Sequence, residues 1–382
     1  MLELRTGCRL HFGLLELAAE YPNRFGGLGL MIATPQVRVA IVQSDPRLES
    51  DRFNEEVERR VGLAVDFAQA QLGAALPDGF KAVMLEIPAL HSGLGVGTQL
   101  AASVATAVEV ALRLALRQRQ DGEQYAPRWP AELENGSQWR NVEALTPHLA
   151  HISGRGKRSA IGLHGFLHGG LIQDLGYANE STSSAAMHTQ YPAPESGALL
   201  PSANPQAVTP RSVFAQATEF PEDWPIVLVL GSEGSRMHGK VEETLITAAG
   251  ARPNPHRDEM IAMSETCMHS ARQRNFDAFV STLENYMALA SRLFESVQAG
   301  RYSSVEIANT VGRATELGLR GVGQSSWGPT VFGFANHIDE ANAIAQRLGQ
   351  LLDARTSQIV ITSASKHGAQ WRITNTGAPH AS

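Results

Sequence analysis

A glycine-rich turn joins an expected strand to an expected helix in the run Ile87-Pro88-Ala89-Leu90-His91-Ser92-Gly93-Leu94-Gly95-Val96-Gly97-Thr98-Gln99-Leu100. Glycines allow positive φ angles and let the backbone approach a ligand closely. The free N–H groups of a first helical turn, backed by the helix dipole, attract anions. A tight structural turn would use the same residues, but the pattern favours a phosphate site. We assign that site to Gly93, Leu94, Gly95, Val96, Gly97, Thr98 and Gln99.

The segments on both sides of this turn predict a mixed fold. Alternating apolar residues indicate strands, and apolar residues at helical spacing indicate helices. Strands are expected at residues 2–10, 36–43, 81–87, 225–230, 330–335 and, as the last strand, 357–362; helices are expected at 54–71, 98–116, 258–274, 276–299, 303–317 and 338–352. The fold class is therefore α+β.

Composition limits the kind of protein. The chain has 382 residues, of which 43% are hydrophobic and 18% charged, as in an ordinary globular enzyme. Its net charge of -6 argues against broad binding to nucleic acid or anionic membranes, so any phosphate site must be local. Two distant cysteines predict neither a disulfide framework nor a cysteine zinc site. Because no apolar run of about 18 residues occurs, we expect a soluble, cytoplasmic protein.

The length and the pattern of elements predict two domains. We place the first, with the phosphate turn, at residues 1–178 and the second at 212–382. Residues 179–211 are rich in Ser, Ala and Pro without any period, which is typical of a mobile excursion.

Three further runs carry side chains suited to anions and sugars. On a strand, Arg9 and His11 would point to one face. Arginine and lysine suit phosphate or carboxylate oxygens, and a histidine can act as acid, base or donor. We expect His164 and His168 to lie on one face of a strand, and we expect His168 to act as an acid, a base or a hydrogen-bond donor. The runs are Arg9-Leu10-His11-Phe12-Gly13 with Arg24-Phe25-Gly26-Gly27-Leu28-Gly29, then Arg155-Gly156-Lys157-Arg158-Ser159, and Gly323-Gln324-Ser325-Ser326-Trp327-Gly328-Pro329-Thr330.

The last of these runs combines amide, hydroxyl and aromatic groups. Gln324, Ser325 and Ser326 could bind sugar hydroxyls, and Trp327 could stack on a ring. A turn with a packing tryptophan would read the same way in the sequence, so this run alone does not establish a site.

The run from Pro88 to Gly95 resembles the second motif of the GHMP kinases. Those kinases usually continue with two serines and alanines, whereas this chain continues with Val96, Gly97, Thr98 and Gln99, which puts ATP use in doubt. Taken in order, all the runs above look like the beta-ribofuranosylaminobenzene 5'-phosphate synthase family of the same superfamily. The resemblance spans nearly the whole chain, with residues 118–140 and 179–211 outside it.

This resemblance implies an N-terminal domain like ribosomal protein S5 domain 2, followed by a GHMP C-terminal domain. It also implies decarboxylative transfer of phosphoribosyl from phosphoribosyl pyrophosphate to para-aminobenzoate or para-hydroxybenzoate in tetrahydromethanopterin biosynthesis, with Mg²⁺. His11 or His168 would then move a proton, with Trp327 and Phe25 as pocket walls. Charges would be held by Arg9, Arg24, Arg155, Lys157 and Arg158, with Ser159 beside them.

Two alternatives stay open at this stage. One is a GHMP small-molecule kinase that uses ATP, and the other is a non-catalytic protein that binds a phosphate ligand. The accepted benzoate, the Mg²⁺ ligands and a homodimer are left open by the sequence.

Overall fold

A computed structural model describes residues 1–18, 23–43, 53, 55–120, 138–142, 149–156, 159–178, 215–231, 240–298 and 300–374. The expected excursion at 179–211 lies outside the described residues, and so do Lys157 and Arg158. In the described part, no helix is long and apolar enough to cross a membrane.

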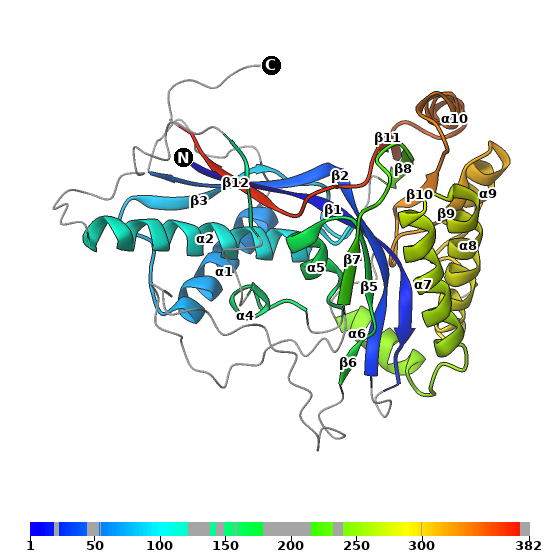
Figure 1. The fold of residues 1–382 in the computed structure, drawn as a ribbon, viewed down its shortest axis with the longest axis horizontal. Coiled ribbons are helices and arrows are strands. Elements are labelled where there is room, and N and C mark those ends of the chain that lie inside the picture. The colour runs from blue at the N-terminus through cyan, green and yellow to red at the C-terminus, as the bar shows by residue number, and fades with distance from the viewer. Residues whose placement is uncertain are drawn as a thin grey trace.

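An eight-stranded antiparallel sheet forms the larger half of the molecule (Figure 1). Its two longest strands, β1 (Leu2–Glu16) and β2 (Asn23–Gln43), form an antiparallel pair. The register of this pair shifts between Gly7 and Cys8 and between His11 and Gly13. Such irregularities bend a strand and increase its twist. The other strands are β3 (Phe80–Glu86), β4 (Arg140–Asn141), β5 (Leu171–Asp174), β6 (Tyr177–Ala178), β7 (Ala215–Thr218) and β12 (Gln370–Ile373).

Helices cover one face of this sheet (Figure 1). They are α1 (Glu55–Leu72), α2 (Val96–Gln120), α4 (Leu149–Ser153) and α5 (Ile161–His168). The alanine- and valine-rich stripe of α2, including Ala102, Ala105 and Val108, is fully buried. Small side chains let a helix approach a sheet closely. Helix α2 packs on β1 and β2 and also contacts α1, α4 and α5, so it is the central helix of this layer.

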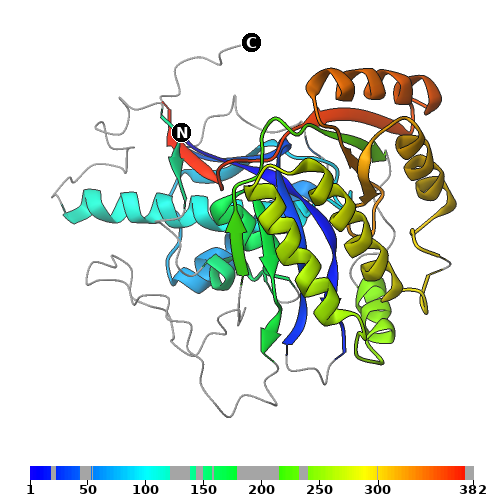
Figure 2. The same cartoon turned by 45° about the vertical axis from the view of Figure 1, so that its right-hand side comes forward.

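A four-stranded sheet in the order β11-β8-β10-β9 forms the second half (Figure 2). Its side chains alternate between two cores: Leu228 and Phe332 face α8, while Val227 and Val331 pack with α9 and α10. The elements are β8 (Ile226–Gly231), β9 (Arg320–Gln324), β10 (Val331–Phe334), β11 (Ser357–Thr362), α6 (Lys240–Ala249), α7 (Arg257–Arg272), α8 (Phe276–Arg292), α9 (Val305–Glu316) and α10 (Ile338–Leu351).

Aromatic side chains join the two halves. The ring of Phe12 on β1 lies 5.3 Å from that of Phe332 on β10. The rings of Phe220, Phe279 and Phe334 pack next to this pair, with Phe220 and Phe279 5.0 Å apart. The bulged part of β1 is therefore held between the two halves of the protein.

Two sequence predictions are wrong. His164 and His168 lie on helix α5 instead of a strand, and residues 357–362 are not the last strand, because β12 follows and pairs with β1. Strands β7 and β12 lie in the first sheet although both follow residue 212. Sheet membership therefore does not follow the expected division of the chain into 1–178 and 212–382.

Candidate active site

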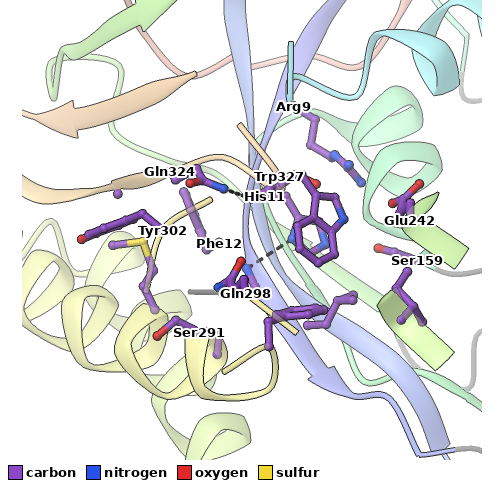
Figure 3. A pocket seen from close by; sticks show the side chains of 18 of the residues that line it. Arg9, His11, Phe12, Ser159, Glu242, Ser291, Gln298, Tyr302, Gln324 and Trp327 are labelled. Atoms are coloured by element: carbon purple, nitrogen blue, oxygen red, sulfur yellow. Dashed lines mark hydrogen bonds between the residues drawn. The ribbon is translucent and has the colours of Figure 1, made fainter. Parts of the chain in front are cut away.

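A cavity of about 400 Å³ opens where the two halves meet (Figure 3). Strand β1, the start of α2, the segment before α5 and helix α6 form one side. The end of α8, the segment after it and the turn after β9 form the other. The lining residues are Arg9, His11, Phe12, Gly13, Leu14, Thr98, Gly154, Arg155, Gly156, Ser159, Glu242, Ile246, Met287, Ala290, Ser291, Phe294, Gln298, Arg301, Tyr302, Gly323, Gln324, Ser326 and Trp327.

The bulge in β1 fixes the imidazole of His11. Gly13 has φ +143, and its N–H donates to His11 Nδ1 at 3.2 Å. The backbone of His11 is held as well: its N–H donates to Ser325 Oγ at 3.1 Å, and its carbonyl accepts from Ser326 N–H at 3.2 Å. A nearly buried side chain, 6% exposed, is thus locked at the wall of the cavity.

The hydrogen bond at Nδ1 decides what His11 can do. Burial lowers the pKa of His11 well below its usual value, and the charge of Arg9 lowers it further. The ring is therefore neutral at physiological pH. Because Nδ1 accepts from Gly13, the network assigns the proton to Nε2. A neutral imidazole in this tautomer is suited to donate to an anion and is a weak base.

Arg9 presents a buried charge that has no hydrogen bond or ion pair within the part of the chain that the structure describes. Its Nε atom is buried and makes no hydrogen bond, and within the described residues its guanidinium has neither a hydrogen bond nor an ion pair. Burial lowers its pKa to about 10, and Glu242 and Cys8 only partly oppose that shift. A buried charge without a partner is costly, so an anion bound here would recover free energy.

Arg155 adds a second cation to the cavity. It too has no hydrogen bond or ion pair with any described residue. Partial burial lowers its pKa, and repulsion from Arg60 lowers it further. Arg60 lies on α1, where it donates to Glu56 at 2.6 Å and to His91 Nε2 at 3.1 Å. Arg9 and Arg155 thus bring two positive charges with few counter-charges to the region near the start of α2, which makes this region favourable for anions.

The glycine turn is held by the second half of the chain. Gly93 and Gly95 have φ +84 and +69, the left-handed region that glycine adopts without strain. Ser325 Oγ donates to the Gly93 carbonyl at 2.8 Å, and Thr330 Oγ1 donates to the Ser92 carbonyl at 2.8 Å. The predicted phosphate turn is therefore positioned by the second glycine-rich run.

The start of α2 carries donors suited to an anion. The N–H groups of Thr98 and Gln99 donate to the Gly95 carbonyl at 3.0 and 3.2 Å. The N–H groups of Val96 and Gly97, in the first helical turn, have no acceptor within the helix. Gly95 also lies directly under Arg9, since a Cβ placed there would be 2.9 Å from Arg9 Nε. Thr98 lines the cavity together with Arg9, whereas Gly93, Leu94, Gly95, Val96 and Gly97 are not among the lining residues.

The structure brings many of the sequence-predicted residues together. Those that line the cavity are Arg9, His11, Thr98, Arg155, Ser159, Gln324, Ser326 and Trp327. Gln99 and Ser325 are fully buried and do not line it. Gln99 accepts from Thr6 Oγ1 at 3.1 Å and donates to the Gly162 carbonyl at 2.9 Å, so it ties α2 to β1 and to α5.

Other predicted residues lie away from the cavity. His168 is exposed at the opposite end of α5 and does not line the cavity. Arg24 donates through Nε to the Leu17 carbonyl at 2.9 Å and stacks on Phe25 at 4.6 Å. Phe25 packs behind Trp327 in a small apolar cluster instead of forming the cavity surface.

Several lining residues carried no signal in the sequence. Met287, Ser291, Phe294, Gln298 and Tyr302 come from the end of α8 and the segment after it. They look like ordinary positions of an amphipathic helix and a connection, and only the packing of α8 against β1 and β9 turns them inward. The sequence analysis also did not identify Glu242, which lines the cavity, or Arg60, which lies on α1 beside the glycine turn.

No protein-family model matches the chain. Three beta-ribofuranosylphenol 5'-phosphate synthases are similar over nearly its full length. The protein of Methanothermobacter thermautotrophicus is 24% identical over 383 residues, covering 96% of this chain and 98% of the relative. The proteins of Methanocaldococcus jannaschii and Archaeoglobus fulgidus are 23% and 24% identical, covering 96% and 98% of this chain and 98% and 100% of their own.

Solved structures with the same fold are small-molecule kinases and decarboxylases. A putative homoserine kinase from Listeria monocytogenes has a TM-score of 0.53 at 12% identity, covering 97% of this chain and 99% of that one. A mevalonate kinase has a TM-score of 0.54 at 12% identity, covering 95% of this chain and 99% of that one. The mevalonate diphosphate decarboxylase of Staphylococcus aureus has a TM-score of 0.53 at 13% identity, covering 97% of this chain and 98% of that one. The predicted GHMP-type α+β fold and the resemblance to the synthases are confirmed.

Proposed function

We infer that this chain belongs to the beta-ribofuranosylaminobenzene 5'-phosphate synthase family, and we propose that it transfers phosphoribosyl from phosphoribosyl pyrophosphate to para-hydroxybenzoate or para-aminobenzoate. One observation carries the proposal: Arg9 and Arg155 line a single cavity, and neither side chain has a hydrogen bond or ion pair with a described residue. A donor with a 5'-phosphate and a pyrophosphate supplies the anions that these cations need. An aromatic acceptor suits the remainder of the cavity wall.

The reaction requires two bonds to break and one to form. The bond between ribose C1 and the pyrophosphate oxygen breaks, and its electron pair leaves with pyrophosphate. The ring carbon that bears the carboxylate attacks C1. The bond from that carbon to the carboxylate then breaks, CO₂ leaves, and its electron pair restores the aromatic ring. The para substituent can release a proton as the ring loses aromaticity and regain it afterwards, so no net proton is consumed.

The residues of this chain stabilise the charge that develops on pyrophosphate. Arg9 and Thr98, at the start of α2, line the same cavity, so both can act on the same anion. His11 donates from Nε2 to an anionic oxygen, a role consistent with its neutral, nearly buried ring. Preorganised donors of this kind need no rearrangement during the reaction and are therefore effective.

Magnesium suits the cavity only as an ion shared with substrate. In the described part of the chain, no group of three or more His, Cys, Asp or Glu side chains could hold a metal. The lining residues include one carboxylate, Glu242, and the hydroxyl of Thr98 at the start of α2. Mg²⁺ often binds through one or two carboxylates together with substrate phosphates. Glu242 and Thr98 would hold it here, and it would neutralise charge on the departing pyrophosphate.

The direct test is an assay of both products. The protein is incubated with Mg²⁺, phosphoribosyl pyrophosphate and carboxyl-labelled para-hydroxybenzoate or para-aminobenzoate. We expect labelled CO₂ and pyrophosphate in equal amounts, dependent on the donor, and the faster acceptor identifies the substrate. Release of neither from folded protein that binds the donor would refute the proposal. Formation of ADP from ATP with a small alcohol would support a kinase instead.

A further inference from the structure

The end of the cavity opposite Arg9 has a different chemistry. In Figure 3, Arg9, Ser159 and Glu242 gather on one side, whereas Tyr302, Gln324 and Ser291 gather on the other. His11 and Trp327 lie between the two groups. The cavity therefore has two chemically distinct ends, with His11 and Trp327 between them.

The far end is lined by aromatic and thioether groups. The rings of Phe294 and Trp327 meet edge to face with centroids 4.7 Å apart. Met287 is 7% exposed and lines the same wall, as does the half-buried Tyr302. Aromatic rings and a polarisable sulfur atom favour a flat aromatic ligand over a sugar or a polyanion.

Gln324 holds two parts of this wall together. Its Oε1 accepts from the Ser303 N–H at 3.0 Å and from Ser303 Oγ at 3.1 Å. Its Nε2 donates to the Ser326 carbonyl at 2.8 Å. One side chain thus links the neighbour of Tyr302 to the neighbour of Trp327. Most of its hydrogen-bonding capacity is used within the protein, which marks it as a positioning residue.

We propose that Met287, Phe294, Tyr302 and Trp327 form the subsite for the benzoate acceptor, and that Gln324 sets the spacing between Tyr302 and Trp327. The proposal rests on the proposed function. The carbon that attacks ribose C1 bears the carboxylate, so this edge of the ring must face the donor at the Arg9 end. The para substituent then points away from Arg9, toward the end of the cavity lined by Ser291 and Tyr302.

The surroundings also suit loss of CO₂. A carboxylate held by a cation is stabilised before reaction, whereas an apolar wall favours conversion of the anion to a neutral gas. Arg9 is engaged by the donor pyrophosphate in this arrangement, so it does not hold the carboxylate of the acceptor. The rings of Phe294 and Trp327, 4.7 Å apart, then provide apolar contact for the reacting edge.

The test separates acceptor binding from donor binding. Para-hydroxybenzoate and phosphoribosyl pyrophosphate are each titrated by calorimetry into wild type, Trp327→Leu and Trp139→Leu. We expect Trp327→Leu to weaken acceptor binding about tenfold and donor binding less than about twofold. Trp139 lies outside the cavity between Arg5 and Arg372, so the same substitution there should leave both affinities unchanged.

Gln324 variants test the positioning role. Gln324→Glu keeps the acceptor for Ser303 but loses the donor to Ser326, and Gln324→Leu loses both. Relative to wild type, we expect the KM for the acceptor to rise about threefold in Gln324→Glu and about tenfold in Gln324→Leu, while the KM for the donor stays constant. Thermal melting confirms that each variant folds.

The outcomes that overturn the inference are distinct from failure of the proposed function. Unchanged acceptor affinity in Trp327→Leu, or an equal loss of donor and acceptor affinity, would rule out the subsite. If wild type binds para-hydroxybenzoate through Trp327 but releases no labelled CO₂, the subsite stands and the proposed reaction is wrong.

Discussion

The two ends of the cavity are built on different principles. At one end, Arg9 and Arg155 carry charges that form no hydrogen bond or ion pair with a described residue. At the other, Gln324, Ser303 and Ser326 satisfy one another, and Phe294 packs on Trp327. The charges at the first end lower the stability of the ligand-free protein, and a bound anion raises that stability again. The second is a preformed surface whose main property is shape.

This contrast indicates how binding energy is divided between the substrates. Electrostatic attraction to the donor is large in a partly desolvated site, whereas an aromatic surface contributes less per contact and more selectivity for shape. Substitutions at the two ends should therefore differ in size, in the substrate they affect and in their effect on the stability of the free protein.

The largest effect is expected for Arg9→Gln. It removes the buried guanidinium, so we expect kcat/KM for the donor to fall roughly 100- to 1000-fold. Removing a buried charge without a partner should also raise the melting temperature of the ligand-free protein by a few degrees. Arg355→Gln, an exposed arginine paired with Asp353, is the matched control. Loss of acceptor binding alone would contradict the assigned donor end.

Next in size is the effect at His11. As a donor through Nε2, it should be replaced partly by glutamine, which keeps an N–H group, and poorly by alanine. We expect kcat to fall roughly 10- to 100-fold in His11→Ala and several-fold less in His11→Gln. The comparison is made at constant pH with both substrates saturating. Equal losses in the two variants would instead favour a role as base.

Gly95→Ala should weaken donor binding and lower the stability of the protein at the same time. Gly95 has φ +69, and a Cβ would lie 2.9 Å from Arg9 Nε, so alanine both strains the turn and moves the guanidinium. We expect donor affinity to fall about tenfold and stability by about 1–2 kcal/mol. At Gly97 the nearest atom to a new Cβ is 3.9 Å away and φ is ordinary, so Gly97→Ala should cost clearly less. Donor titration and thermal melting measure both effects.

The smallest effect lies outside the cavity, at His164. Burial, then repulsion from His168, lowers the pKa of His164 to about 4. The unfolded state therefore binds a proton that the folded state does not, so stability falls as the pH drops below about 6.5 toward 4. We expect His164→Asn to flatten this acid dependence by on the order of 1–2 kcal/mol, measured by urea unfolding across that range, with no change in either KM. An unaltered pH dependence would mean that His164 does not contribute.

The sequence predicted elements whose cause is local. The helix expected at 54–71 appears as α1 at Glu55–Leu72, and the turn at 88–97 has positive φ at Gly93 and Gly95. Periodicity and glycine conformation act over a few residues, so they can be recognised without the rest of the chain. Helix α5 was assigned to a strand because its helical state depends on contacts: Gly162 packs on Thr98, and a Cβ at Gly165 would meet the Met31 sulfur at 2.4 Å.

Local patterns in the sequence were enough to predict the α+β class, the glycine turn and part of the cavity wall, because Arg9, His11, Arg155 and Trp327 lie in runs whose composition indicates anion or ring binding. Contacts between distant segments were needed to show that Gln99 and Ser325 hold the framework, that His168 lies away from the site, and that Phe294 and Tyr302 form its second wall. The return of β12 to β1 and the inward turn of the end of α8 depend on segments far apart in the chain. Such contacts form only when distant surfaces are buried together, and no local pattern records them.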